Sequence, residues 1–324
     1  MENKDLNNNE VIQPKFEMFS YPYIKDNTST SKIMLDVIIA LIPAIIGSVY
    51  FFGLDALILI VVSILSCVGF EFLSQKGFKK PVRISDLSAV VTGILLAMNL
   101  PANAPYWLPI FGGFFAMFII KECFGGIGNN FINPALGARA LLMASWGSNM
   151  TSYIAPDAST GATPLAILKE GSGILPSMFD MSIGNIGGVL GETSTLLLLI
   201  GAIYLIIKGV IDWKIPLLYI LSTAILLPIL GVQIDLIPYH LLGGGLILGA
   251  FFMATDYATI PTTATGKIIF AVGCGVITAL IRVIGSYPEG VSYAILIMNV
   301  ATPMIDRYIQ PKVFGEVKAK WKII

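Results

Sequence analysis

Long apolar runs recur along almost the whole chain, and they restrict its possible folds more than any other feature. Runs such as 33–52, 54–73 and 267–281 are separated by short polar or Gly/Pro-rich breaks. About 20 apolar residues in a helix cross the roughly 30 Å hydrocarbon core of a bilayer. Only 12% of the 324 residues are charged, against roughly 25% in soluble proteins. The sequence therefore predicts an all-α polytopic membrane protein with the lipid bilayer as its solvent.

We expect about ten transmembrane helices in two sets of five. They lie near 33–52, 54–74, 86–100, 106–121 and 129–147, and near 187–208, 214–231, 238–254, 267–285 and 290–305. If the N-terminus is cytoplasmic, all Lys and Arg except Lys169, Arg139 and Arg282 fall on the cytoplasmic side. This positive-inside bias predicts that both ends lie in the cytoplasm and that the loop after the fifth crossing lies outside.

These crossings divide the chain into five parts. We expect a polar cytoplasmic segment at 1–30, a first five-helix repeat at 31–147, an extracytoplasmic loop at 148–184, a second five-helix repeat at 185–308 and a basic cytoplasmic tail at 309–324. The first part lacks a basic stretch that leads into a short apolar core, so it does not read as a secretory signal.

The third to fifth crossings and the last three correspond when shifted by about 160 positions, a self-comparison that reveals repeats. The correspondences are Leu100-Pro101 with Ile260-Pro261, Gly112 with Gly273, Ile120 with Ile281 and Lys121 with Arg282. Five crossings per half would place the second half upside down, as in many transporters. The segments NLPANAP and ATDYATIPTTATG read either as broken helices around a central site or as ordinary loops. A solute channel or secondary transporter with an inverted-repeat fold is therefore one functional hypothesis.

Several ionisable residues lie within or at the ends of the apolar segments. They are Glu71, Asp86, Glu122, Asp212, Asp256, Arg139 and Arg282. Such groups are candidates for an ion path, although most lie close enough to a helix end to reach water. His240 is expected at the membrane interface. We expect Cys67, Cys123 and Cys274 to be small packing residues, since their spacing suggests neither a disulfide nor a metal site.

The long outside loop contains the sequence DASTGATPLAILKEG, from Asp157 to Gly171. Thr163, Pro164 and Gly171 read as the N-cap, first residue and stop of a short helix over 165–170. The free N–H groups at its start would also favour a bound anion.

Residues 157–163 resemble a flavinylation motif, in which an Asp is followed by [S/T]-G-A-T. In proteins with this motif, a flavin transferase joins the phosphate of FMN to the last Thr hydroxyl as a phosphodiester. Residues 31–308 resemble the D subunit of the Rnf ferredoxin:NAD+ oxidoreductase complex and, more distantly, the B subunit of the sodium-pumping NADH:quinone oxidoreductase. The run NFINPALGARALL, 130–142, is a further match. The sodium-pump subunit usually has a longer N-terminal extension, which favours the Rnf family.

The resemblance implies a covalent FMN on Thr163, with Ser159, Thr160, Gly161 and Ala162 as the recognition segment. Arg139, inside the fifth crossing, is a further cofactor-binding candidate, which can pair with a carboxylate, a flavin oxygen or a phosphate. A second, noncovalent flavin, riboflavin, is implied in the helix bundle without specified residues.

The function implied is a membrane electron-transfer subunit of a ferredoxin:NAD+ oxidoreductase complex that translocates Na+ or H+. Its partners would be the other Rnf subunits, which hold iron–sulfur clusters and another covalent FMN, and a flavin transferase for maturation. The location implied is a bacterial or archaeal cytoplasmic membrane. The chain shows no dinucleotide-binding fingerprint after a predicted strand, so NAD and ferredoxin are expected to dock on other subunits. We expect no catalytic residues, no metal site and no nucleic-acid partner in this chain.

Overall fold

The computed structural model describes residues 29–155, 161–171, 175–192, 194–285 and 287–310. Within these ranges the protein is helical and has no strand, only an isolated bridge between Pro101 and Val189. The predicted all-α class is confirmed for this part of the chain. The N-terminal segment 1–28 and the tail beyond 310 lie outside the described residues.

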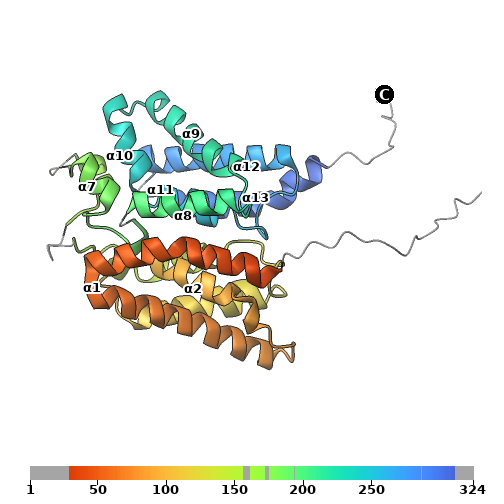
Figure 1. The fold of residues 1–324 in the computed structure, drawn as a ribbon. Helices are drawn as coiled ribbons and strands as arrows, with labels where there is room; N and C mark the ends of the chain where they lie inside the picture. The colour runs from red at the N-terminus through yellow and green to blue at the C-terminus, as the bar shows by residue number, and fades with distance from the viewer. Residues whose placement is uncertain (1–28, 156–160, 172–174, 193, 286, 311–324) are drawn as a thin grey trace, which may run out of the picture.

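The first two predicted crossings form one continuous element, α1 (Thr30–Gly77), which is divided at Gly53. Gly53 has φ 71° and ψ −155°, a conformation that only glycine adopts without strain. The arms 30–52 and 54–77 therefore run side by side in opposite directions (Figure 1, red and orange). Ser29 caps the first arm by accepting a hydrogen bond from the Lys32 backbone N–H at 3.3 Å.

Helical segments also occupy the other predicted crossings. In the first half these are η1 (Ile84–Asp86), α2 (Ser88–Met98), α3 (Trp107–Phe114), the π-helical η2 (Phe115–Glu122) and α4 (Pro134–Ser145). The connecting loop holds α5 (Gly147–Met150), α6 (Pro164–Glu170), α7 (Met178–Ile183) and η3 (Leu190–Glu192). The second half has α8 (Thr195–Ile207), α9 (Lys214–Ile229), η4 (Ile234–Leu236), α10 (Ile237–Leu242), α11 (Leu246–Leu248), the π-helical η5 (Gly249–Met253), α12 (Ala264–Val283) and α13 (Val291–Tyr308).

Length and composition identify α1 and α12 as helices that can cross a membrane, with the bent pair 234–242 and 246–253 as a third candidate. Large apolar side chains are exposed on the outer helix faces, among them Leu65, Ile203 and Ile225. Soluble proteins rarely leave such large apolar areas uncovered, whereas lipid accommodates them. The chain is thus a multi-pass helical membrane protein. The count of ten crossings and the inverted relation of the halves stay predictions.

The two halves form two stacked layers. In Figure 1 the red-to-yellow half lies below the green-to-blue half, and α8 runs along the first arm of α1. The described chain begins and ends at one end of the bundle, whereas α7 lies at the opposite end (Figure 1). The helix α7 is therefore separated from both ends of the described chain by the length of the bundle.

The helices are interrupted at two places that shape the interior. After α2, the chain leaves helical geometry at Asn99, and Leu190 N–H donates to the Leu100 carbonyl at 2.9 Å. In the second half the chain bends by 61° between 242 and 246. The segment ATDYATIPTTATG, 254–266, was read either as a broken helix or as an ordinary loop, and its residues 254–263 form a loop between η5 and α12. The bend lies earlier because Gly244 and Gly245 both have positive φ.

Small residues allow the helices to pack closely. An added Cβ at Gly201 in α8 would lie 2.0 Å from the carbonyl oxygen of Ala40 in α1, and one at Gly93 in α2 would lie 2.7 Å from the Ile64 Cα. Small side chains at contacts between membrane helices let their backbones approach. The contact at Gly201 joins the first half to the second.

We predict that Gly201→Ala lowers the free energy of unfolding by about 1–3 kcal/mol, because the new methyl group meets backbone that cannot rotate away. Gly69→Ala is the matched control, since nothing lies within 4 Å of its added Cβ. Thermal melting of both variants in detergent checks this. Equal melting temperatures would show that the α1–α8 contact tolerates a methyl group.

Candidate functional site

The segment around Thr163 has the predicted local structure. Thr163 is extended, with φ −64° and ψ 155°, and its Oγ1 accepts a hydrogen bond from the Ala166 N–H at 3.2 Å. Pro164 is the first residue of α6, and Gly171 ends the helix with φ 66°. The predicted cap, start and stop are confirmed.

The structure describes only part of the predicted recognition segment. Gly161 and Ala162 are exposed, whereas Thr163 is 3% exposed. Ser159 and Thr160 lie outside the described residues. Thr163 lies in the wall of a cavity, and its Oγ1 caps α6.

This cavity has a volume of about 230 Å³ and brings together residues from distant parts of the chain. Its wall includes Arg139, Tyr153, Thr163, Tyr287, Glu289 and Tyr293. The rings of Tyr287 and Tyr293 are stacked, with centroids 5.6 Å apart and planes inclined by 29°. Lys169 donates to the carbonyls of Gly285 and Tyr287. These bonds tie α6 to the segment before α13, so both sides of the cavity are held together.

Arg139 pairs with a carboxylate, one of the three partners considered from the sequence. It forms an ion pair with Glu289 and donates to Asn99 Oδ1 at 2.9 Å and to Ser292 Oγ at 2.8 Å. The Tyr153 hydroxyl donates to the other oxygen of Glu289 at 3.1 Å. Burial, followed by the neighbouring Glu289, raises the pKa of Tyr153, so its hydroxyl stays a donor at neutral pH. Glu289 was not among the residues singled out from the sequence, although it is the only acidic residue between the last two predicted crossings.

Arg282 holds the bend of the second half. Its guanidinium donates to the carbonyl of Glu289 at 2.8 Å, to that of Gly243 at 3.2 Å and to that of His240. Backbone carbonyls freed by a bend inside a membrane protein need such donors. His240 was expected at the interface but is buried, and its Nδ1 has no hydrogen-bond partner among the described residues. The triplet Gly243–Gly245 was the sequence signal that could have located this bend.

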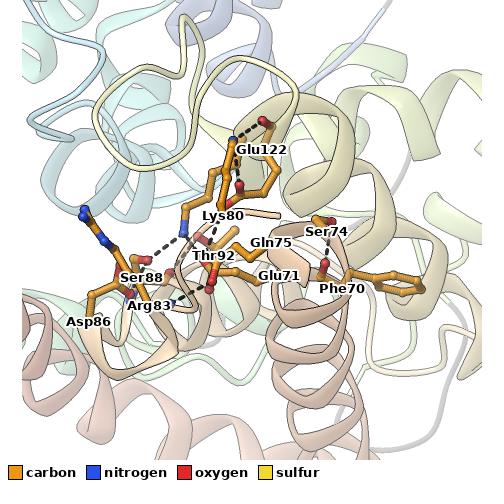
Figure 2. Close-up of polar contacts among 11 residues, drawn as sticks. Phe70, Glu71, Ser74, Gln75, Lys80, Arg83, Asp86, Ser88, Thr92 and Glu122 are labelled. Carbon is orange, nitrogen blue, oxygen red and sulfur yellow. Dashed lines mark hydrogen bonds and ion pairs between the residues drawn. The ribbon is translucent and has the colours of Figure 1, made fainter. Parts of the chain in front are cut away.

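A second cluster of charges lies where α1, η1 and η2 meet (Figure 2). Lys121 Nζ lies 2.5 Å from Glu71 Oε1, and both residues are buried. Lys80 forms an ion pair with Glu122 at 3.2 Å, and Gln75 donates to the same carboxylate at 3.2 Å. Most of the acidic candidates were expected to reach water, but Glu71 and Glu122 are buried and paired with Lys121 and Lys80. The cytoplasmic side of Lys121 stays a prediction.

The remaining candidates are less deeply enclosed. Asp86 and Asp256 are partly buried. Asp212 Oδ2 lies 3.9 Å from Lys267 Nζ, and both of these side chains are partly exposed. Cys67 and Cys274 are buried as expected for packing residues, whereas Cys123 is exposed. Cys123 is exposed because it follows η2, where the chain turns at the end of the bundle.

Comparison with known proteins matches residues 17–315 to the model of the NQR2, RnfD, RnfE family. The chain belongs to this family. It is 53% identical over 307 residues to the D subunit of the Na(+)-translocating ferredoxin:NAD(+) oxidoreductase complex of Acetobacterium woodii, covering 93% of this chain and 96% of the relative. It is 44% identical over 318 residues to the D subunit of the proton-translocating ferredoxin:NAD(+) oxidoreductase complex of Clostridium ljungdahlii, with the same coverage. The D subunit of the ion-translocating oxidoreductase complex of Methanosarcina acetivorans is 37% identical over 297 residues, covering 91% of this chain and 96% of the relative.

The family membership confirms the resemblance to Rnf D subunits that was inferred from the loop motif and the run 130–142. Arg139 belongs to that run. One of the segments that carried the resemblance thus supplies a wall residue of the cavity beside Thr163.

We predict that Arg139→Met lowers the free energy of unfolding by about 3–5 kcal/mol, because Glu289 loses its buried counter-charge. The double variant Arg139→Met/Glu289→Gln removes both charges and should recover most of the loss. Thermal melting of the single and double variants tests this. A double variant as unstable as Arg139→Met would show that the ion pair is not the cause.

Proposed function

We propose that the chain is the membrane electron-transfer subunit of an ion-translocating ferredoxin:NAD+ oxidoreductase complex. The names of its relatives support this, since each is a D subunit of an ion-translocating oxidoreductase complex. The other subunits of that complex are its proposed partners. We assign no coupling ion, because one relative is named for Na+ and another for protons.

We further propose that Thr163 carries covalent FMN, attached by a flavin transferase. The observation that carries this proposal is the hydroxyl of Thr163 in the wall of a cavity lined by a cation and aromatic rings. The cap of α6 uses a lone pair of Oγ1, so replacing the hydroxyl hydrogen with a phosphoryl group leaves that acceptor in place. The cavity volume of about 230 Å³ is close to the roughly 300 Å³ at which small-molecule pockets begin.

The residues around the cavity fit the chemical groups of FMN. Tyr287 and Tyr293 offer ring faces to a planar aromatic group. Arg139 is paired with Glu289 and bonded to Ser292, which hold its guanidinium in place, so it would act on a phosphodiester or a flavin oxygen as a fixed hydrogen-bond donor. Lys169 fixes α6 against the opposite wall. When bound, the flavin supplies the electron-transfer chemistry, while these side chains bind it, orient it and exclude water.

We also propose the membrane arrangement expected from the charges. It has ten crossings in two inverted repeats, cytoplasmic chain ends and an extracytoplasmic flavin loop, in a bacterial or archaeal cytoplasmic membrane. The position of α7 at the end of the bundle opposite both ends of the described chain supports this orientation (Figure 1).

We predict that Thr163→Ala abolishes the flavin fluorescence of the denatured protein band after co-expression with a flavin transferase. Thr163→Ser keeps a hydroxyl and should retain at least part of the fluorescence. Thr151→Ala, at another threonine in the cavity wall, should retain all of the fluorescence. Mass spectrometry of the 152–169 region then locates the added FMN. An unmodified Thr163 in the working complex would overturn the flavin assignment and favour a solute channel or secondary transporter.

The noncovalent riboflavin is a separate proposal, and we assign it no residues. The cavity between the two halves has a volume of about 100 Å³, well below the roughly 300 Å³ of the smallest typical ligand pockets. We predict that denaturing the purified complex releases a flavin that is not covalently attached, and that Thr163→Ala does not reduce the amount released. Chromatography of the released flavin measures this. Absence of free flavin from the active complex would contradict the proposal.

A further inference from the structure

Two neighbouring cavities, which share Ile127 in their walls, lie where α1, α2 and η2 converge. The first has a volume of about 270 Å³ and is lined by polar residues, among them Glu71, Arg83, Asp86, Glu122 and Asn129. The second is the cavity of about 100 Å³ between the two halves, lined by 33–37 and 88–95 of the first half and by 205–211 and 251–258 of the second. The first is a charged space at the end of the bundle, whereas the second reaches its interior.

Side chains from each cavity contact one another across the wall between them. Lys121 and Ser88 line the interior cavity, and Glu71 and Asp86 line the polar cavity. Lys121 Nζ donates to Glu71 Oε1 at 2.5 Å and to Ser88 Oγ at 2.7 Å. Ser88 Oγ donates to Asp86 Oδ1 at 2.7 Å. Figure 2 shows Ser88 and Asp86 beside Glu71, with the side chain of Lys80 directed to Glu122.

The ammonium of Lys121 is the positive charge shared with the interior cavity, whereas Lys80 and Arg83 line the polar cavity alone. Lys121 is 3% exposed and Glu71 is 0% exposed, so little water screens the ammonium. Glu71 Oε2 has no hydrogen-bond partner among the described residues. Only Oε1 of this carboxylate accepts a hydrogen bond there. Gln75 Nε2 donates both to Glu71 Oε1 at 3.3 Å and to Glu122 Oε1 at 3.2 Å, and Lys80 donates to Glu122 Oε2. A cation in the polar cavity that moves inward therefore meets Lys121 behind Glu71.

Two features make this wall movable. A lysine side chain is a flexible four-carbon stem with a compact charge, so rotation about its bonds can withdraw the ammonium without moving a helix. In addition, Lys121 is at the end of the π-helical η2, and π-helical turns are frequent at functional sites.

We propose that Lys121 is a gate whose ammonium closes the passage for cations between the polar cavity and the cavity between the halves. With the ammonium on Glu71 and Ser88 the passage is shut, and its withdrawal opens it. The role of this gate in controlling ion movement during electron transfer rests on the proposed function. The existence of the gate depends only on the two cavities and the contacts between them.

The test measures access to the interior cavity in the full complex in sealed membrane vesicles, with Cys67, Cys123 and Cys274 replaced by Ala or Ser. Val91→Cys places a thiol in the wall of the interior cavity, and Asn129→Cys places one in the polar cavity. A cationic, membrane-impermeant methanethiosulfonate is added to each side in separate experiments. Asn129→Cys should react from one side whatever residue occupies position 121.

With Lys121 present, Val91→Cys should react slowly. With Lys121→Met it should react at least about tenfold faster from the same side as Asn129→Cys, because a fixed charge strongly repels a nearby cationic reagent in poorly screened surroundings. Lys121→Arg keeps the charge and should stay slow. Lys121→Met should increase the labelling rate of a neutral thiol reagent less than that of the cationic one.

Lys121→Met leaves Glu71 without its partner and can disturb folding, so Glu71→Gln/Lys121→Met, which removes both charges, is measured in parallel. Fast labelling in this double variant supports the gate. Equal rates with and without Lys121 in the folded double variant would overturn it and leave a static ion pair. An Asn129→Cys thiol that reacts from neither side would also overturn it. Loss of flavin from Thr163 leaves these rates unchanged, so failure of the redox proposal is recognised separately.

Discussion

Much of the structure depends on one constraint, that charges enclosed by the helix bundle need partners within the protein. Lipid cannot stabilise a charged group, and a buried charge left alone is far costlier than a buried pair. Arg139 with Glu289 meets this requirement at one end of the bundle, and Lys121 with Glu71 meets it where α1 and η2 converge. Within the described part of the chain, Arg282 forms no ion pair and instead donates to backbone carbonyls at the bend of the second half. The broken helices are therefore positioned by their charges as well as by apolar packing.

The sequence predicts those features that depend on neighbouring residues or on the solvent. The bilayer sets the length of apolar segments, so the positions of the helical segments were foreseen, including the two arms of α1. Local backbone chemistry sets the cap at Thr163, the start at Pro164 and the stop at Gly171, and all three have their predicted roles. The loop motif that indicated the family is also local, because all of its residues lie within 157–163.

Features that depend on distant contacts were not predictable in the same way. Glu289 is 150 positions from Arg139, and no periodicity connects them. Lys121 looked like a residue at the cytoplasmic boundary because a basic side chain at a helix end usually reaches water. Its burial depends on Glu71, which comes from another helix. The enclosure of Thr163 likewise depends on Lys169 and the segment before α13, which the loop sequence alone does not reveal.

The bond between Arg139 and Glu289 also has a consequence for how the protein is made. The two residues are 150 positions apart, so at roughly 5–20 residues per second the ribosome needs about 8–30 s to deliver the second after the first. Throughout that interval the nascent first half contains a guanidinium without its carboxylate. The ion pair that joins α4 to the segment before α13 can therefore form only after the last loop has been synthesised.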